Sequence, residues 1–244
     1  MTTPSSSSST AKKRLLAVNG GGAGNLHGLR ARRLTEKLPW DVTVVDLDRS
    51  SRQAGMKHMR QLLTEHWDLV YLESTGIAGG LPLIQSKQRY VVSSGDPVAG
   101  FFQVTEGWAQ GQIFGAYEKA LYRKSAGFIG WTPYLVGRAI ELGAPRGVTI
   151  EGGVDLDKFR PLPIEQKQAA RERFGIPQGH LVCGIVGSLR WNERQSYSYG
   201  LELVEALKRV KRTDMSLLIV GDGDGRAQLE SRVPAELKER AIFT

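Results

Sequence analysis

Cysteine is nearly absent from this chain, because Cys183 is the only one among 244 residues. A single cysteine excludes a disulfide within the chain. Its place in the apolar run 181–186 predicts a small, buried hydrophobic side chain. The four histidines show no metal-ligand spacing with carboxylates or with the cysteine, so we expect no metal site. They are His27, His58, His66 and His180.

Long apolar runs are missing as well. No segment approaches the ~20 consecutive apolar residues that a transmembrane helix requires. The first ten residues contain five consecutive serines, Ser5 to Ser9, and lack the apolar stretch of a secretory signal. Such a polar run buries too little apolar surface to fold. We therefore expect a cytoplasmic protein with a disordered tail over residues 1–13.

The chain carries an excess of positive charge, with 33 Lys and Arg against 25 Asp and Glu and a net charge of +8. A solvated basic surface is the simpler interpretation. Attraction to phosphates is the alternative, either on a small molecule or on anionic lipids, which leaves peripheral membrane contact open. Nucleic acid is not an expected partner, because the cations are scattered and no reader motif is present.

Short apolar runs alternate with longer amphipathic segments from residue 14 onward, which is typical of a parallel α/β sheet covered on both faces. Strands are predicted at 15–18, 42–45, 68–72, 89–93, 128–131 and 148–150, and helices at about 29–38, 52–66 and 107–125. We expect a complete Rossmann-like domain over residues 14–160, followed by a linker over 161–180.

A second unit follows the linker, over residues 181–244. Its predicted strands are 181–186 and 216–220 with a last apolar segment at 241–243, and its predicted helix covers about 195–212. Three strands are too few for a doubly wound domain, so we expect a partial domain. The apolar strand around 217–220 is expected to lie next to a missing neighbour, which predicts marginal stability and self-association.

A glycine-rich loop between the first strand and the first helix is the first candidate binding site. Its candidate ligand-binding residues are Gly20, Gly21, Gly22, Gly24 and Asn25. Glycines let the backbone approach a phosphate or sugar, and a helix N-terminus adds backbone N–H donors. A tight packing turn is the simpler alternative. A dinucleotide fingerprint would need a glycine at the sixth place, where Asn25 stands, although Asp46 after the second strand keeps that option open.

Asp96 follows the fourth predicted strand, at the carboxyl edge where open α/β sheets bind ligands. It is the candidate catalytic residue, either accepting a proton or bonding a sugar hydroxyl. The equal alternative is a turn residue before Pro97. After the third strand, residues 74–80 are expected to form a flexible polar loop at the same edge.

In the second unit, the loop 187–194 follows a strand and carries two guanidinium groups. Ser188, Arg190 and Arg194 are its candidate ligand-binding residues, because arginine makes bidentate contacts with diphosphates. An exposed helix cap is the simpler alternative. The loop 221–225 is expected to be structural. We expect the two units to face each other across a cleft, with the loop 20–28, Asp96 and Arg190 on its walls.

Three stretches together resemble the family 4 glycosyltransferases, which have the two-domain GT-B architecture. They are the strand–helix segment 128–143, the Gly153-Val154-Asp155 motif with Phe159 and Pro161, and 187–207 with 217–223. The resemblance implies metal-independent transfer from a nucleotide-sugar donor with retention of configuration and no cofactor. It leaves the acceptor open among lipids, carbohydrates and small metabolites.

The chain departs from that family at several positions. Ser188 stands where the family places an arginine, Tyr199 where a lysine precedes glycine, and Ser94-Gly95-Asp96 where a histidine is common. The glutamate pair that grips the donor sugar is expected beyond Thr244, so the chain resembles part of such an enzyme. A Rossmann oxidoreductase using loop 20–28 and Asp46, and a non-catalytic remnant, stay open as alternatives.

Overall fold

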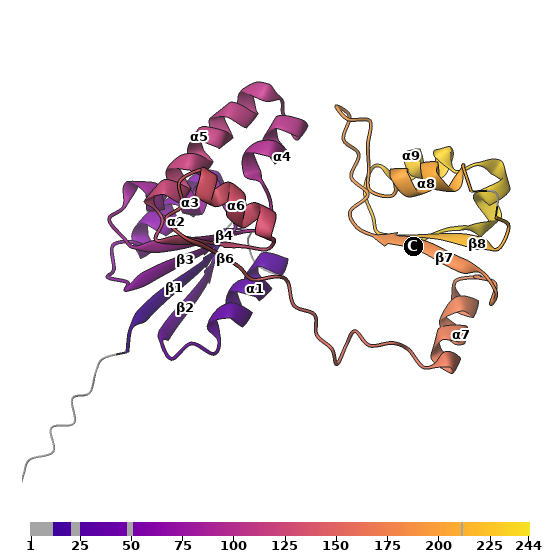
Figure 1. The fold of residues 1–244 in the computed structure, drawn as a ribbon, viewed down its shortest axis with the longest axis horizontal. Helices are drawn as coiled ribbons and strands as arrows, with labels where there is room; N and C mark the ends of the chain where they lie inside the picture. Colours follow the sequence, from indigo (N-terminus) through magenta and orange to yellow (C-terminus); the bar gives the residue numbers. More distant parts are fainter. Residues whose placement is uncertain (1–11, 21–24, 48–50, 211) are drawn as a thin grey trace, which may run out of the picture. The chain divides into compact units, whose positions relative to one another are not determined.

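The computed structural model describes residues 12–20, 25–47, 51–210 and 212–244. By its internal contacts the chain divides into two compact units, and the division falls between Gly153 and Val154. Unit 1 denotes the part before this division and unit 2 the part after it (Figure 1). The domain limits expected at residues 160 and 180 stay predictions.

Unit 1 is built on a six-stranded sheet in the order β2-β1-β3-β4-β5-β6, and every strand pair is parallel. The strands are β1 (Arg14–Asn19), β2 (Asp41–Asp46), β3 (Leu69–Glu73), β4 (Tyr90–Ser94), β5 (Gly127–Gly130) and β6 (Gly147–Thr149). Each coincides within two residues with a predicted strand. The predicted parallel α/β sheet is therefore confirmed.

Helices cover the two faces of this sheet unequally (Figure 1). They are α1 (Leu26–Thr35), α2 (Arg52–Leu62), α3 (Ile77–Gln85), α4 (Val98–Thr105), α5 (Trp108–Lys124) and α6 (Pro133–Glu141). Alternate strand residues point to opposite faces. Leu16 and Leu72 join a core with side chains of α2, α3, α5 and α6, while Leu15 and Tyr71 on the other face join Ala31 of α1.

The structure corrects one expectation in unit 1 and adds one helix. The segment 74–80 is not a loop, since α3 begins at Ile77, and Gly79 and Gly80 let this helix pack closely on Leu72 and Tyr117. A Cβ on Gly80 would lie only 2.0 Å from the Tyr117 hydroxyl oxygen. The helix α4 was also not predicted. Both helices follow directly on strand ends rich in Gly, Ser and Pro, a composition that favours turns.

Unit 2 contains a three-stranded parallel sheet in the order β7-β8-β9. Its elements are α7 (Ile164–Arg173), β7 (Leu181–Val186), α8 (Leu201–Leu207), β8 (Met215–Val220), α9 (Arg226–Arg232), the 3₁₀ helix η1 (Ala235–Arg240) and β9 (Ala241–Phe243). The helix expected from 195 starts only at Leu201. Gly200 has a left-handed backbone with φ 97°, which no helix passes through, and Asn192 pairs with Tyr197 before it.

The exposed apolar strand of unit 2 is β7 rather than the predicted segment 217–220. The strand β8 is central, and its Leu217 and Ile219 are buried. β7 lies at the edge of the sheet, with Val186 80% exposed. Cys183 on β7 is half-buried rather than buried as expected. In the described part of the chain, no helix is long and apolar enough to cross a membrane.

Candidate functional site

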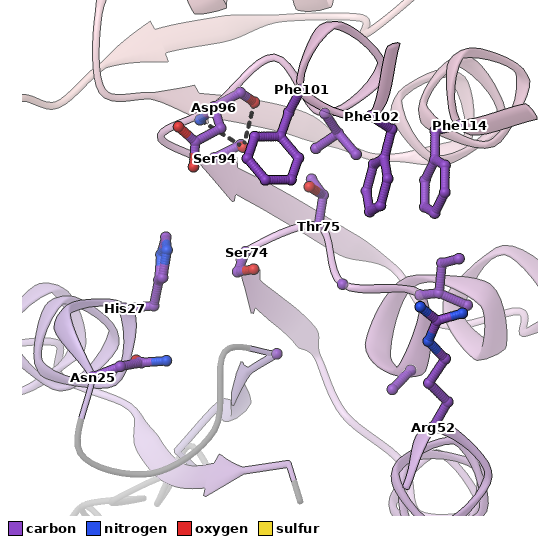
Figure 2. Close-up of a pocket in the computed structure, with 15 residues that line it drawn as sticks. Asn25, His27, Arg52, Ser74, Thr75, Ser94, Asp96, Phe101, Phe102 and Phe114 are labelled. Atoms are coloured by element: carbon purple, nitrogen blue, oxygen red, sulfur yellow. Dashed lines mark hydrogen bonds between the residues drawn. The ribbon is translucent and has the colours of Figure 1, made fainter. Parts of the chain in front are cut away.

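A pocket of about 430 Å³ lies in unit 1 at the carboxyl ends of β1, β3 and β4 (Figure 2). Parallel strands end together at this edge, where open α/β sheets gather ligands. Its polar lining includes Gly20, Asn25, His27, Ser74, Ser94 and Asp96. The pocket therefore brings together three of the predicted site residues: Gly20, Asn25 and Asp96. Gly21, Gly22 and Gly24 lie outside the described residues.

The strongest chemical arrangement at this pocket is a histidine backed by a buried carboxylate. His27, in the first turn of α1, has its Nδ1 3.1 Å from Oε1 of Glu73, at the end of β3. The Glu73 side chain is fully buried, whereas His27 is 25% exposed and lines the pocket. An ionised carboxylate accepts hydrogen bonds only, so Nδ1 carries the proton and Nε2 is left to accept one.

Two further groups compensate the buried charge of Glu73. The hydroxyl of Tyr71, two residues earlier on β3, donates to Oε2. The Nε of Arg30 lies 3.6 Å from the same oxygen. Burial first, and the neighbouring Glu73 charge second, raise the pKa of Tyr71 well above its ordinary value, so this phenol stays a donor. Tyr71 and Arg30 thus stabilise the Glu73 carboxylate as donors and do not compete for the Nδ1 proton of His27.

Asn25 has a structural role beside its place in the pocket wall. Its side chain accepts a hydrogen bond from the backbone N–H of Gly28 at 2.9 Å, which caps α1 and explains why the helix begins earlier than predicted. Asp46 accepts bonds from Asn19 at 2.8 Å and from Arg32 at 2.6 Å, and Arg32 lowers the Asp46 pKa. The Asp46 carboxylate is thus engaged inside unit 1 rather than presented to a ribose.

Asp96 lies on the opposite wall, in the turn after β4. Its backbone N–H donates to the Ser94 hydroxyl at 3.2 Å, and that hydroxyl donates to the Asp96 carbonyl at 2.9 Å. These two bonds fix the turn before Pro97. The carboxylate is exposed and makes no ion pair with any residue that the structure describes. Asp96 is therefore both the turn residue and an available charge in the pocket.

An aromatic wall closes the pocket on the side of α4 and α5. Phe102 and Phe114 stack with their ring centroids 3.5 Å apart, and Phe101 beside them is 56% exposed (Figure 2). The wall is tied to α6 by buried Glu118 of α5, which accepts from the backbone N–H of Ala99 on α4 and from both terminal nitrogens of Arg138 on α6. The aromatic surface is thus held in place by a buried ion pair.

In unit 2, the loop after β7 carries the other predicted residues. Ser188, Arg190 and Arg194 are all exposed, and within the described ranges neither arginine forms an ion pair. The loop after β8 supports this one, because the N–H of Leu189 donates to Asp222 and Leu189 accepts from Gly225. A Cβ on Gly221 would lie 1.9 Å from the carbonyl oxygen of Gly187. This fits the structural role expected for 221–225.

His27 and Glu73 were not singled out as site residues from the sequence. Each carried a usable signal, since His27 stands in the glycine-rich loop and Glu73 directly follows an apolar strand, as Asp96 does after the next strand. Among the described residues, no group of three or more His, Cys, Asp or Glu side chains is placed to hold a metal ion.

Comparisons with known proteins bear on the fold and on part of the sequence. No protein-family profile matches the chain. The chain is 36% identical over 110 residues to a 2-deoxystreptamine glucosyltransferase of Streptomyces kanamyceticus, a match that covers 43% of this chain and 27% of that enzyme. The chain thus spans about a quarter of the length of this curated relative.

The structure is similar to that of HepE from Anabaena solved in complex with UDP and glucose, with a TM-score of 0.64 at 16% identity. The superposition covers 95% of this chain and 68% of HepE. A second structure of HepE, in complex with UDP, superposes with a TM-score of 0.62 over 94% of this chain and 68% of that one. The chain has a GT-B-type fold. In this GT-B-type chain the first Rossmann-like sheet has six strands and the second has three.

Proposed function

We propose that the chain is part of a glycosyltransferase that moves a sugar from a nucleotide-sugar donor to a hydroxyl group bound in the unit 1 pocket. The observation that carries the proposal is the pair of His27 and buried Glu73 at the mouth of that pocket. The GT-B-type fold and the sequence similarity to a glucosyltransferase support the reaction class. The substrate is the nucleotide sugar, and no further cofactor is required.

In the proposed reaction, the acceptor oxygen forms a bond to the anomeric carbon of the sugar. The bond from that carbon to the diphosphate breaks, and the nucleoside diphosphate leaves with the bonding electrons. The proton of the acceptor hydroxyl passes to Nε2 of His27. Glu73 orients the ring through Nδ1 and stabilises the imidazolium that forms. Asp96 is the alternative proton acceptor, and single substitutions separate the two.

For the donor, we propose that Ser188, Arg190 and Arg194 contact the diphosphate. The two arginines are exposed at the carboxyl edge of β7. Their guanidinium groups suit bidentate contact with phosphate oxygens. Uridine diphosphate is the favoured nucleotide, because HepE was solved with UDP. From the resemblance to family 4 we expect retention of configuration, which requires the acceptor oxygen to approach the anomeric carbon from the same face that the diphosphate leaves.

For the acceptor, we propose an amine-bearing polyol of the 2-deoxystreptamine type, as the curated relative's name suggests. Asp96 offers a carboxylate to an ammonium group, and the exposed face of Phe101 offers a cation–π contact. Ser74 adds a hydroxyl group to the same pocket, whereas the Ser94 hydroxyl is already bonded within the turn. A purely lipid acceptor would leave the Asp96 carboxylate without a partner, so the polar acceptor fits the lining better.

The test is incubation of the chain with UDP-glucose and 2-deoxystreptamine, with the product followed by mass spectrometry. We expect a glucosylated product, and a proton NMR coupling typical of an α-glucoside if configuration is retained. A β-glucoside would overturn retention alone. An absence of saturable 2-deoxystreptamine binding would overturn the acceptor assignment, and binding that survives both Asp96→Asn and Phe101→Ala would overturn the roles of these two residues.

A further inference from the structure

Arg30 is a charged side chain that the proposed chemistry leaves unused. It lies on α1, one turn after His27, and only 8% of the residue is exposed. A buried guanidinium is costly unless its charge and its N–H groups are compensated. Its partners therefore show what holds it in place.

The partners of Arg30 come from three strand ends. Its terminal nitrogens donate to the backbone carbonyls of Ile150, at 2.5 Å, and Glu151, at 3.2 Å. Its guanidinium lies 4.8 Å from the ring centroid of Trp131, directly after β5. Its Nε is buried with no hydrogen bond, 3.6 Å from Oε2 of Glu73. Arg30 thus contacts the His27 partner on one side and the backbone after β6 on the other.

The carbonyls that Arg30 holds belong to the start of the connector between the units. Ile150 and Glu151 directly precede Gly152 and Gly153, where unit 1 ends. Neither glycine has an atom within 4 Å of a Cβ built on it, so this stretch has no packing of its own. Besides the backbone bond from the Ile150 N–H to the Gly130 carbonyl, the hydrogen bonds from Arg30 are the side-chain contacts that tie the connector to unit 1 in the described structure.

We infer that Arg30 is a positioning residue that couples the connector to the pair of His27 and Glu73. If the carbonyls of Ile150 and Glu151 withdraw, two of its donors lose their acceptors. The nearest remaining acceptor is Glu73, so the guanidinium moves toward the carboxylate that holds the imidazole. The ring of His27 also contacts Trp131, at 5.4 Å between centroids, so a shift of Arg30 on Trp131 disturbs His27 from a second side. Only the expected effect of Arg30 on catalysis rests on the proposed function. The structural coupling does not.

The first test needs no activity. Endoproteinase Glu-C cleaves after glutamate, and the Glu151 carbonyl is held by Arg30 while Glu165 on α7 is exposed. In Arg30→Met we expect cleavage after Glu151 to accelerate about tenfold relative to cleavage after Glu165, because two charge-assisted hydrogen bonds are lost. Arg33→Met is the matched control on the same helix, since Arg33 is exposed and, among the described residues, pairs only with Glu36. An unchanged ratio in Arg30→Met would overturn the proposal.

The second test measures the coupling to the pocket. NMR signals of the His27 ring and of the Glu151 amide should shift together in Arg30→Met and stay in place in Arg33→Met. Transfer by Arg30→Met should lose about tenfold in kcat with an unchanged KM for the donor, since only positioning is impaired. Arg30→Lys keeps the charge but not the two-pronged geometry of the guanidinium, so its kcat should lie between those of the wild type and of Arg30→Met.

If the wild-type chain transfers no sugar, the proposed function fails, while the protease ratio and the NMR shifts still decide the role of Arg30. Shifts confined to Glu151 would reduce Arg30 to a structural role.

Discussion

Nδ1 of His27 lies 3.1 Å from Oε1 of Glu73, and the two residues are 46 positions apart in the chain. Their meeting follows from the strand order, because β1 pairs directly with β3 and α1 starts just beyond the end of β1. The His27 side chain lines the pocket, whereas the Glu73 side chain is fully buried from solvent. This is the arrangement that fixes a tautomer and leaves one nitrogen for chemistry.

The first prediction separates the two carboxylates around this histidine. Glu73→Gln removes the charge that stabilises the imidazolium, and we expect transfer to fall by roughly tenfold to a hundredfold. Asp96→Asn should instead raise KM for an amine-bearing acceptor with little change in kcat, because it removes ground-state binding. Steady-state kinetics with varied acceptor measures both. A larger loss of kcat in Asp96→Asn than in Glu73→Gln would make Asp96 the proton acceptor.

The second prediction concerns the buried pair of Glu118 and Arg138. The carboxylate is fully buried, and its oxygens lie 2.5 Å and 2.7 Å from the two terminal nitrogens of Arg138. Glu118→Gln leaves a partly buried cation unpaired, and we expect a loss of about 3 kcal/mol in the free energy of unfolding. Urea denaturation measures it. Glu36→Gln breaks the exposed pair with Arg33 as a control, and should cost less than about 1 kcal/mol.

The third prediction concerns pH. Arg32 lowers the pKa of Asp46 from its ordinary value of 3.8, so the folded state holds this proton less tightly than the unfolded state. The stabilisation is therefore complete above about pH 4 and is lost as pH falls through the folded pKa. Denaturation midpoints measured between pH 5 and pH 2 should fall less steeply in Asp46→Asn than in the wild type, as linkage requires. Parallel curves for the two proteins would contradict the assignment.

The fourth prediction concerns the edge strand of unit 2. β7 is apolar and exposes Val186, and the helix α7 before it buries none of its residues. An exposed apolar edge invites pairing with another chain, so we expect self-association, reduced by Val186→Lys. Light scattering coupled to size-exclusion chromatography measures this. Limited proteolysis should cut first between 161 and 178. A monomeric wild type that resists cleavage there would show that unit 2 needs no further partner.

The sequence predicts the strands well and the helices after them less well. Buried parallel strands are nearly continuous apolar runs, so 15–18 or 89–93 stand out against polar surroundings. The helix α4 does not, because Gly and Pro at its start resemble a turn. The predicted helix 195–212 starts only after Gly200, because Gly200 has a left-handed backbone that the sequence pattern does not reveal.

The location of the candidate site at the strand ends was predicted better than the residues that carry its chemistry. Asp96, Gly20 and Asn25 were found because they follow strands, and the structure gathers them at one pocket. The link from His27 to Glu73 was missed because strand order, which local periodicity does not encode, decides which strand ends are neighbours. The role of Asn25 as helix cap was not predicted, because the glycine-rich run 20–28 is typical of a loop and gives no clear signal for the start of α1.

The central claim is that His27 accepts the acceptor proton in a sugar transfer, and one assay tests it most directly. Release of UDP from UDP-glucose is measured in the presence of 2-deoxystreptamine for the wild type, His27→Ala and His66→Ala. His66 is exposed and lies outside the pocket. We predict that His27→Ala loses roughly 10²- to 10⁴-fold in rate and that His66→Ala matches the wild type. Equal rates in the wild type and His27→Ala would contradict the account.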